Sequence, residues 1–420
     1  MRRVSAFGLL AFANFATCGL GQSFLGEEGK LSMSNLGPLA FVIFAAPCFL
    51  ADVKTIRKPT VAFFLLFNVC ALVSFALFMF RFGWMPNAPV LGFQDVEFIF
   101  MLLLVWYARR NYEEFFAVAK AGIFCCALLA IWYGVSQFRN PGGAKLNIII
   151  FSMDDKSHAA VLFCCLSYIV LRYYDGWFAR LLSGGLFAMS MMTLSRLPIV
   201  FLPVLLITLS KRTRYGWMVA TATVCVVAAA FIAFGDALTL IFKAVDRLTS
   251  VNQVAGDNAT AAHLLLIKSA LEMKFGDLGA FFFGTGPGNF SKALTSFPID
   301  IHELQAIDPA LVDDARVGRA PMHSTPVSFL LDYNIVVVGV LVFMALRAIR
   351  YLVKARRNLE LMFFATLFVA SMFYSVHNKP YFYLAIVTIA IAVVGPLPEE
   401  ERERTPLTRP EDVPPPLPAG

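Results

Sequence analysis

The sequence contains few charged residues. Only 15% of its 420 residues are Asp, Glu, Lys or Arg, whereas 59% are hydrophobic. A soluble globular domain has about 25% charged residues, so this shortage indicates an integral membrane protein. The apolar runs are about 17–22 residues long and do not alternate with polar positions, which predicts membrane-spanning helices.

Cysteine is absent from every predicted loop. All eight cysteines fall inside predicted spans, which argues against disulfides and against a cysteine metal site. The net charge of +7 comes from connecting segments, with no soluble basic face that would bind nucleic acid. We therefore expect an all-α protein with no metal, no cofactor and no nucleic-acid partner.

The hydrophobic pattern predicts about twelve spans. A charged start before residues 4–20 resembles a signal peptide, but no small-residue cleavage site follows, so we retain this stretch as the first span. The predicted spans are 4–25, 34–51, 61–80, 91–108, 115–135, 157–174, 178–194, 196–210, 216–234, 324–346, 360–376 and 380–397.

These spans divide the chain into four parts. Spans one to nine occupy 1–234, a long loop occupies 235–323, spans ten to twelve occupy 324–397, and a proline-rich tail that we expect to be disordered occupies 398–420. Lysine and arginine concentrate in alternate connections, which predicts cytoplasmic termini and an external long loop.

The long loop has structure of its own. Asn258 or Thr260 is a candidate cap for a helix over about 260–275, with Lys268 and Lys274 expected away from its apolar stripe.

Arg196 has the clearest functional implication. It follows Ser195 between two long apolar stretches, at the outer turn of a predicted hairpin. A guanidinium keeps its charge, and a charge at membrane depth costs at least about 2–3 kcal/mol unless it is compensated. A lipid diphosphate matches its forked donors, so we expect Arg196 to bind one.

Four of the five histidines are predicted on the outer side: His263, His302, His323 and His377. Loop histidines are usually solvated, so the argument rests on position. His323 opens a span at the depth at which Arg196 emerges, and His377 lies in the last outer turn. An imidazole there can accept a proton from a hydroxyl nucleophile while Arg196 stabilises a departing diphosphate. The alternative is an interfacial His323 hydrogen-bonded to lipid headgroups.

The run from Gly284 to Gly288 is a second candidate site. Its backbone N–H groups, those of Gly286 and Gly288 included, could face a phosphate. No Lys-Ser/Thr follows, so it is not a nucleotide loop, and a structural turn is the favoured interpretation.

Three blocks resemble the bacterial O-antigen ligase and polymerase family. They are Thr193-Leu194-Ser195-Arg196, the element Gly284-Thr285-Gly286-Pro287-Gly288-Asn289-Phe290, and His323-Ser324 at the start of a span. The resemblance covers roughly residues 185–345. It implies a metal-independent glycosyltransferase of the outer leaflet, in which Arg196 holds the diphosphate and His323 orients or deprotonates the acceptor.

The chain departs from the family pattern at two places. Where the family has a second arginine at the start of the loop helix, this chain has His263; Arg247, Lys268 and Arg319 are the candidates to replace that arginine. The glycines that the family has downstream of its histidine are Asn334 and Val337 here. This weakens the ligase interpretation more than the resemblance to the family, because an exopolysaccharide polymerase branch tolerates looser patterns.

The expected function is glycan transfer from undecaprenyl diphosphate to a sugar hydroxyl at the periplasmic face of the bacterial inner membrane. We favour a polymerase of O-antigen or exopolysaccharide, whose acceptor is lipid-linked. The alternatives are a ligase that attaches finished polymer to lipid A-core, and a transporter or flippase of lipid-linked sugars. A structural subunit of a polysaccharide export complex is a further alternative, and proteins of that machinery are expected partners.

Overall fold

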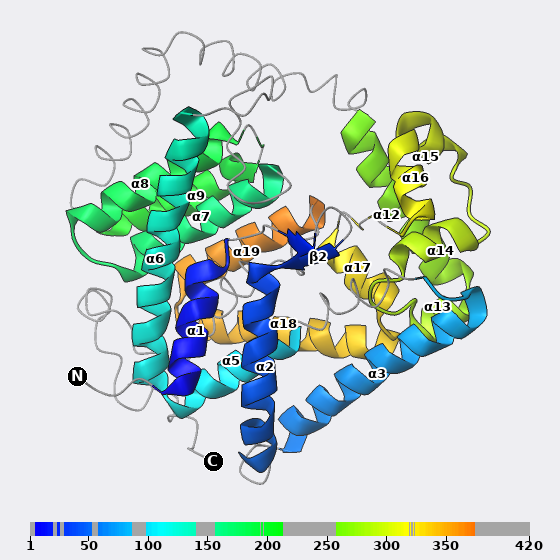
Figure 1. The fold of residues 1–420 in the computed structure, drawn as a ribbon, viewed down its shortest axis with the longest axis horizontal. Coiled ribbons are helices and arrows are strands. Elements are labelled where there is room, and N and C mark those ends of the chain that lie inside the picture. Colours follow the sequence, from blue (N-terminus) through cyan, green and yellow to red (C-terminus); the bar gives the residue numbers. More distant parts are fainter. Residues whose placement is uncertain are drawn as a thin grey trace.

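The computed structural model describes residues 5–19, 23–25, 29–52, 58–85, 98–139, 156–193, 195, 197–212, 258–318, 320, 322 and 324–373. This part of the chain is helical apart from one short hairpin, which confirms the all-α class (Figure 1). The helices of the N-terminal half are α1 (Ala6–Thr17), α2 (Met33–Ala51), α3 (Lys58–Phe82), α5 (Phe98–Arg110), α6 (Tyr112–Arg139), α7 (Lys156–Tyr173), α8 (Trp177–Met192) and α9 (Leu197–Arg212). Those of the C-terminal half are α12 (Asn258–Gly276), α13 (Leu278–Phe283), α14 (Phe290–Ser296), α15 (His302–Ile307), α16 (Pro309–Arg316), α17 (Thr325–Asp332), α18 (Ile335–Lys354) and α19 (Asn358–Phe373).

The hairpin corrects the predicted first span. Strands β1 (Ser23–Leu25) and β2 (Gly29–Ser32) pair antiparallel, and α1 ends at Thr17 instead of continuing to residue 25. Gly19 and Gly21 follow the helix, and glycine disfavours a helix interior by about 1 kcal/mol relative to alanine.

The predicted tenth span, 324–346, is wrong as a single helix. It is divided at Tyr333 and Asn334 into the short α17 and the long α18. Tyr333 has extended backbone angles, and the Asn334 side chain caps α18 by accepting a hydrogen bond from the N–H of Val336 at 2.7 Å. An asparagine in this position begins a new helix more readily than it continues an old one.

Helices lie where most of the other spans were predicted. They are α2, α3, α5, α6, α7, α8, α9 and α19. The predicted spans 216–234 and 380–397 lie outside the described residues, as does the tail. The loop helix predicted over 260–275 is confirmed as α12.

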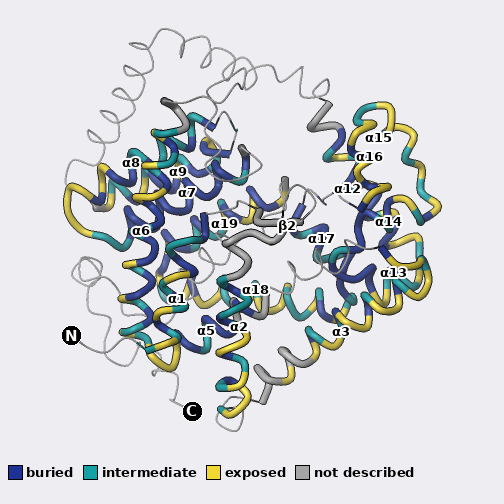
Figure 2. The backbone as a smooth tube through the Cα atoms, in the orientation of Figure 1, coloured by how far each residue is buried: buried dark blue, intermediate teal, exposed yellow. Residues whose placement is uncertain are grey.

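Two of the described helices are long and apolar enough to cross a membrane. They are the segment Tyr112–Ser136 of α6 and the whole of α18. Few residues of the α18 segment are buried by other parts of the protein (Figure 2). Its Phe343 side chain is 60% exposed. Apolar side chains that face outward along a 20-residue helix are the pattern expected for contact with lipid.

The helices form a bundle and a smaller lobe. In the bundle, α7 is surrounded: apart from His158, every residue from Ser157 to Arg172 is buried, and the helix lies against α6, α8 and α9 (Figure 2). The lobe contains α12 to α17 around a second apolar core, which the Phe78 side chain of α3 joins. Helix α3 reaches across to this lobe, and α19 lies against both α9 of the bundle and α17 (Figure 1).

Candidate functional site

Most residues of the predicted site lie outside the described part of the chain. They are Arg196, Arg247, Arg319, His323 and His377. The elements next to two of them are described: α9 begins one residue after Arg196, and α17 begins two residues after His323. Helix α19 contacts both of these helices, so the helices that follow Arg196 and His323 share one structural neighbour.

Two predicted binding residues lie on α12. His263 is half-buried, and Lys268 is exposed, with its Nζ atom 4.0 Å from Oε1 of Glu272. Five residues separate the two, which places them about 140° apart around the helix. They therefore do not project from one face of α12.

The glycine element packs against the end of α17. The N–H groups of Thr285 and Gly286 donate to the carbonyls of Leu331 and Asp332, at 3.0 and 2.9 Å. Gly284, Gly286 and Gly288 all have positive φ angles, of 81°, 79° and 81°. Two of the N–H groups that the sequence analysis considered for phosphate binding are therefore engaged by protein, which favours the structural turn.

The close packing at this element requires glycine. A Cβ atom on Gly284 would lie 2.4 Å from the Asp332 carbonyl oxygen, and one on Gly286 would lie 2.4 Å from Cα of Phe75 in α3. Real Cβ atoms do not approach backbone this closely, so the spacing of glycines reflects contact between α3, the element and α17.

The carboxylate of Asp332 is the centre of a buried polar network. Its Oδ1 accepts a hydrogen bond from Oγ1 of Thr285 at 2.9 Å, and its Oδ2 accepts one from Oγ of Ser328 at 2.8 Å. The side chain is only 3% exposed. A carboxylate at a helix C-terminus opposes the helix dipole, so these hydroxyl donors compensate an otherwise unfavourable charge.

The predicted position of Lys274 is wrong. It was expected on the polar side of α12, yet it is fully buried, and its Nζ donates to the carbonyls of Ala280 and Tyr333 at 2.7 and 2.9 Å. Burial lowers the pKa of Lys274 to about 8, and the nearby Asp332 carboxylate partly offsets this effect. A lysine interrupting an apolar stripe was the signal available in the sequence.

An ion pair attaches the lobe to the end of α3. Arg81 contacts Asp277 at 2.7 Å, and its guanidinium lies 4.6 Å from the ring centre of Phe82. The hydrogen bond from Arg81 lowers the pKa of the Asp277 carboxyl. Asp277 also caps α13 by accepting from the N–H of Ala280, so this contact helps to hold the glycine element in place.

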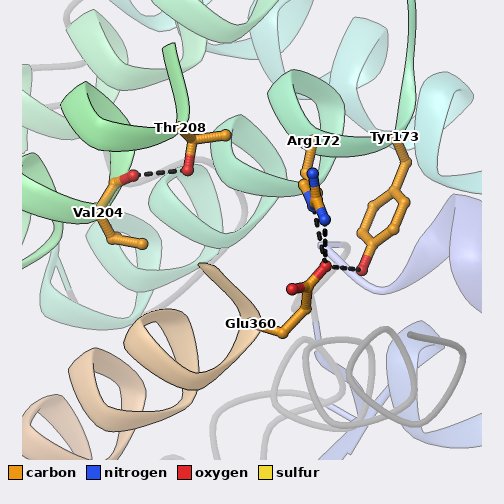
Figure 3. Close-up of polar contacts among 5 residues, drawn as sticks. All are labelled: Arg172, Tyr173, Val204, Thr208 and Glu360. Carbon is orange, nitrogen blue, oxygen red and sulfur yellow. Dashed lines mark hydrogen bonds and ion pairs between the residues drawn. The ribbon is translucent and has the colours of Figure 1, made fainter. Parts of the chain in front are cut away.

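A second buried charge cluster lies in the bundle (Figure 3). Arg172, in the last turn of α7, donates from Nε and Nη2 to Oε1 of Glu360, in the first turn of α19, both at 2.8 Å. The side chains are 4% and 1% exposed. The hydroxyl of Tyr173 points at the same oxygen, 3.5 Å away, and nearby on α9 Thr208 donates to the Val204 carbonyl (Figure 3).

The two clusters differ in what they can do. Arg172 and Glu360 neutralise one another between two helix ends and offer no nucleophile. The network around Asp332 joins α17 to the glycine element, and the hydrogen bonds of Lys274 add α12 and α13. Along the chain, it is separated from His323 and Ser324 by α17. It can therefore fix the position of α17, and with it the chain segment that precedes α17.

Comparison with known proteins gives no family. Neither the protein-family models nor the curated proteins contain a match to this chain.

Proposed function

We propose that this chain is a glycosyltransferase of the bacterial inner membrane, with about twelve spans, cytoplasmic termini and a periplasmic active face. It moves a glycan from undecaprenyl diphosphate to a sugar hydroxyl during the polymerisation of a surface polysaccharide. Ligation of the finished polymer to lipid A-core is the alternative, because donor and bond chemistry are the same.

One observation carries this proposal. The α8–α9 turn that contains Ser195 and Arg196, and the segment His323-Ser324 before α17, adjoin helices that both lie against α19. A permanently charged guanidinium and an imidazole are the two groups that this reaction requires.

The chemistry follows from the donor. The acceptor hydroxyl attacks the sugar carbon that carries the diphosphate, a new C–O bond forms, and the C–O bond to the diphosphate breaks. His323 takes the hydroxyl proton, and Arg196 stabilises the charge on the departing undecaprenyl diphosphate. No metal is needed in this scheme. Further cations and histidines to hold the diphosphate or the glycan are Arg247, Lys268, Arg319, His263 and His377.

The exposed apolar surface supports the membrane location. Leu72 on α3 is 68% exposed, and Phe343 on α18 is 60% exposed. Trp132 and Trp177 are also exposed, and tryptophan favours the boundary between lipid and water.

A transporter of lipid-linked sugars is less well supported. Such a protein is expected to carry charged or helix-breaking residues near the middle of paired spans. In the described residues, the buried pair of Arg172 and Glu360 joins helix ends instead. Cysteines introduced into the central spans and reactive from both sides of the membrane would favour transport.

Deletion of the gene tests the function, with the surface glycan as readout. Single repeat units left on the lipid carrier are expected for a polymerase, whereas finished polymer stranded on undecaprenyl diphosphate indicates a ligase. An unchanged surface glycan would refute both.

Two substitutions test the site. Arg196→Lys should lose most polymer, because an ammonium cannot make a bidentate contact with a diphosphate. His323→Ala should abolish transfer while leaving membrane insertion intact, and His302→Ala is the matched control because His302 is exposed on α15. Normal polymer from Arg196→Lys, or a silent His323→Ala beside a damaging His302→Ala, would overturn the assignment.

A further inference from the structure

The last carbonyl groups of α17 accept hydrogen bonds from other elements. Three successive carbonyls, those of Leu331, Asp332 and Tyr333, accept hydrogen bonds from Thr285 N, Gly286 N and Lys274 Nζ, at 3.0, 2.9 and 2.9 Å. The last carbonyls of a helix have no partner within it, so these donors supply what the helix lacks. The whole C-terminus of α17 is thereby fixed from outside.

The elements that supply these donors are themselves immobilised. The Phe283 carbonyl accepts from Ser74 of α3, and the amide of Asn289 donates to the Thr285 carbonyl at 2.8 Å. Gly286 lies against the backbone of Phe75, seven residues before the end of α3, where an added Cβ would overlap it. The glycine element is therefore a rigid support that is packed away from the surface.

A side-chain hydrogen bond joins the Asp332 carboxylate to this support. Thr285 Oγ1 donates to Oδ1 from the glycine element, whereas Ser328 Oγ donates to Oδ2 from within α17 itself. Loss of the first bond weakens the attachment of α17 to its support, where the three carbonyl contacts remain, while loss of the second leaves that attachment unchanged.

Helix α17 is short and transmits this position to its other end. It has eight residues, so its two ends are about 12 Å apart, and His323 precedes it by two residues. Because the helix is this short, a small shift of its C-terminus displaces its N-terminal end as well.

We propose that Thr285 and Asp332 are positioning residues, which fix α17 on the glycine element so that His323 meets the acceptor hydroxyl. This inference rests on the proposed function. It gives the glycine element a mechanical role in catalysis in place of a role in phosphate binding.

The test compares two variants that each remove one hydrogen bond from the same carboxylate. Purified protein in nanodiscs is supplied with the undecaprenyl-diphosphate-linked oligosaccharide that accumulates in the deletion strain, and polymer formation is measured at varied donor concentration. Thr285→Val should lower kcat by roughly tenfold to a hundredfold with KM changed less than about twofold, because misplacement by about 1 Å can reduce the rate this much. Thr285→Ser keeps the hydroxyl and should restore the rate.

Ser328→Ala is the matched control. It should lower the melting temperature by about as much as Thr285→Val, because each leaves one carboxylate oxygen without its hydroxyl donor, yet kcat should change less than about threefold. Thr285→Ala, which lacks the branched side chain, replaces the valine variant if that variant does not yield folded protein. Equal loss of kcat in the Thr285 and Ser328 variants would overturn the positioning role. Wild-type protein that forms no polymer from this donor would instead refute the proposed function.

Discussion

The buried ion pair between α7 and α19 gives a quantitative prediction. Arg172 and Glu360 are 4% and 1% exposed, so removal of either leaves the other charge in a medium that solvates it poorly. We expect Arg172→Met and Glu360→Leu each to reduce the free energy of unfolding by about 3–5 kcal/mol. The loss of stability should be larger for Glu360→Leu. A second buried cation, Arg357, acts electrostatically on Tyr173, whose hydroxyl lies beside the Glu360 carboxylate, so removal of this carboxylate affects two cations.

The double variant Arg172→Met/Glu360→Leu separates the interaction energy of the pair from the effects of the two single substitutions. With both charges replaced by apolar side chains, the protein should recover to within about 2 kcal/mol of wild type, because no unpaired charge remains. Unfolding by SDS in mixed micelles measures all four proteins of the cycle, and the coupling energy should be at least about 3 kcal/mol. Arg316→Met, which breaks an exposed pair with Asp313, should change stability by less than about 1 kcal/mol. Strictly additive effects of the two single variants would refute the assignment of a tight buried pair.

Two further predictions concern the lobe. Gly286→Ala should destabilise the protein by roughly 2–5 kcal/mol, because alanine at φ 79° is strained and its Cβ overlaps Phe75. Gly276→Ala is the control: a Cβ there meets nothing within 4 Å, so stability should change by less than about 1 kcal/mol. Similar melting temperatures for these two variants would contradict the packing described. Lys274 should make stability rise with pH between about 8 and 10.5, because the unfolded chain binds more protons there; the gain over a Lys274→Met variant, measured by melting in detergent, should reach about 3 kcal/mol. Both hydrogen bonds persist across this range because a neutral amine keeps two hydrogens. Falling stability over that range, relative to Lys274→Met, would mean that Asp332 holds the lysine charged.

Local patterns predicted the elements whose signals are contained in one segment. Helices α8 and α9, with the turn between them, follow from apolar runs that flank Ser195. Helix α12 has the predicted extent, but it buries Lys274, which was expected away from its apolar stripe. The division between α17 and α18 has local signals too, since Pro326 suits the first turn of one helix and Asn334 caps the next. The hydropathy stays high across both helices, so it does not indicate the break between them.

Contacts between distant segments could not be predicted in this way. The residues around Lys274 do not indicate that it donates to the Tyr333 carbonyl, and those around Arg172 do not indicate that it pairs with Glu360. The glycine spacing suggested a turn, but its purpose depends on Phe75 and on the end of α17, which only the folded chain brings to it. The spacing of apolar residues along a helix indicates which of its faces is buried, but it does not indicate which other segment covers that face.

The separation of Arg172 from Glu360 bears on how the chain is made. The two residues are 188 positions apart. At a synthesis rate of about 5–20 residues per second, the carboxylate leaves the ribosome roughly 10–40 s after the guanidinium. Helix α7 is therefore complete well before this charge can be matched. A chain that stops short of α19 thus lacks the carboxylate that pairs with Arg172, so this ion pair marks the finished bundle.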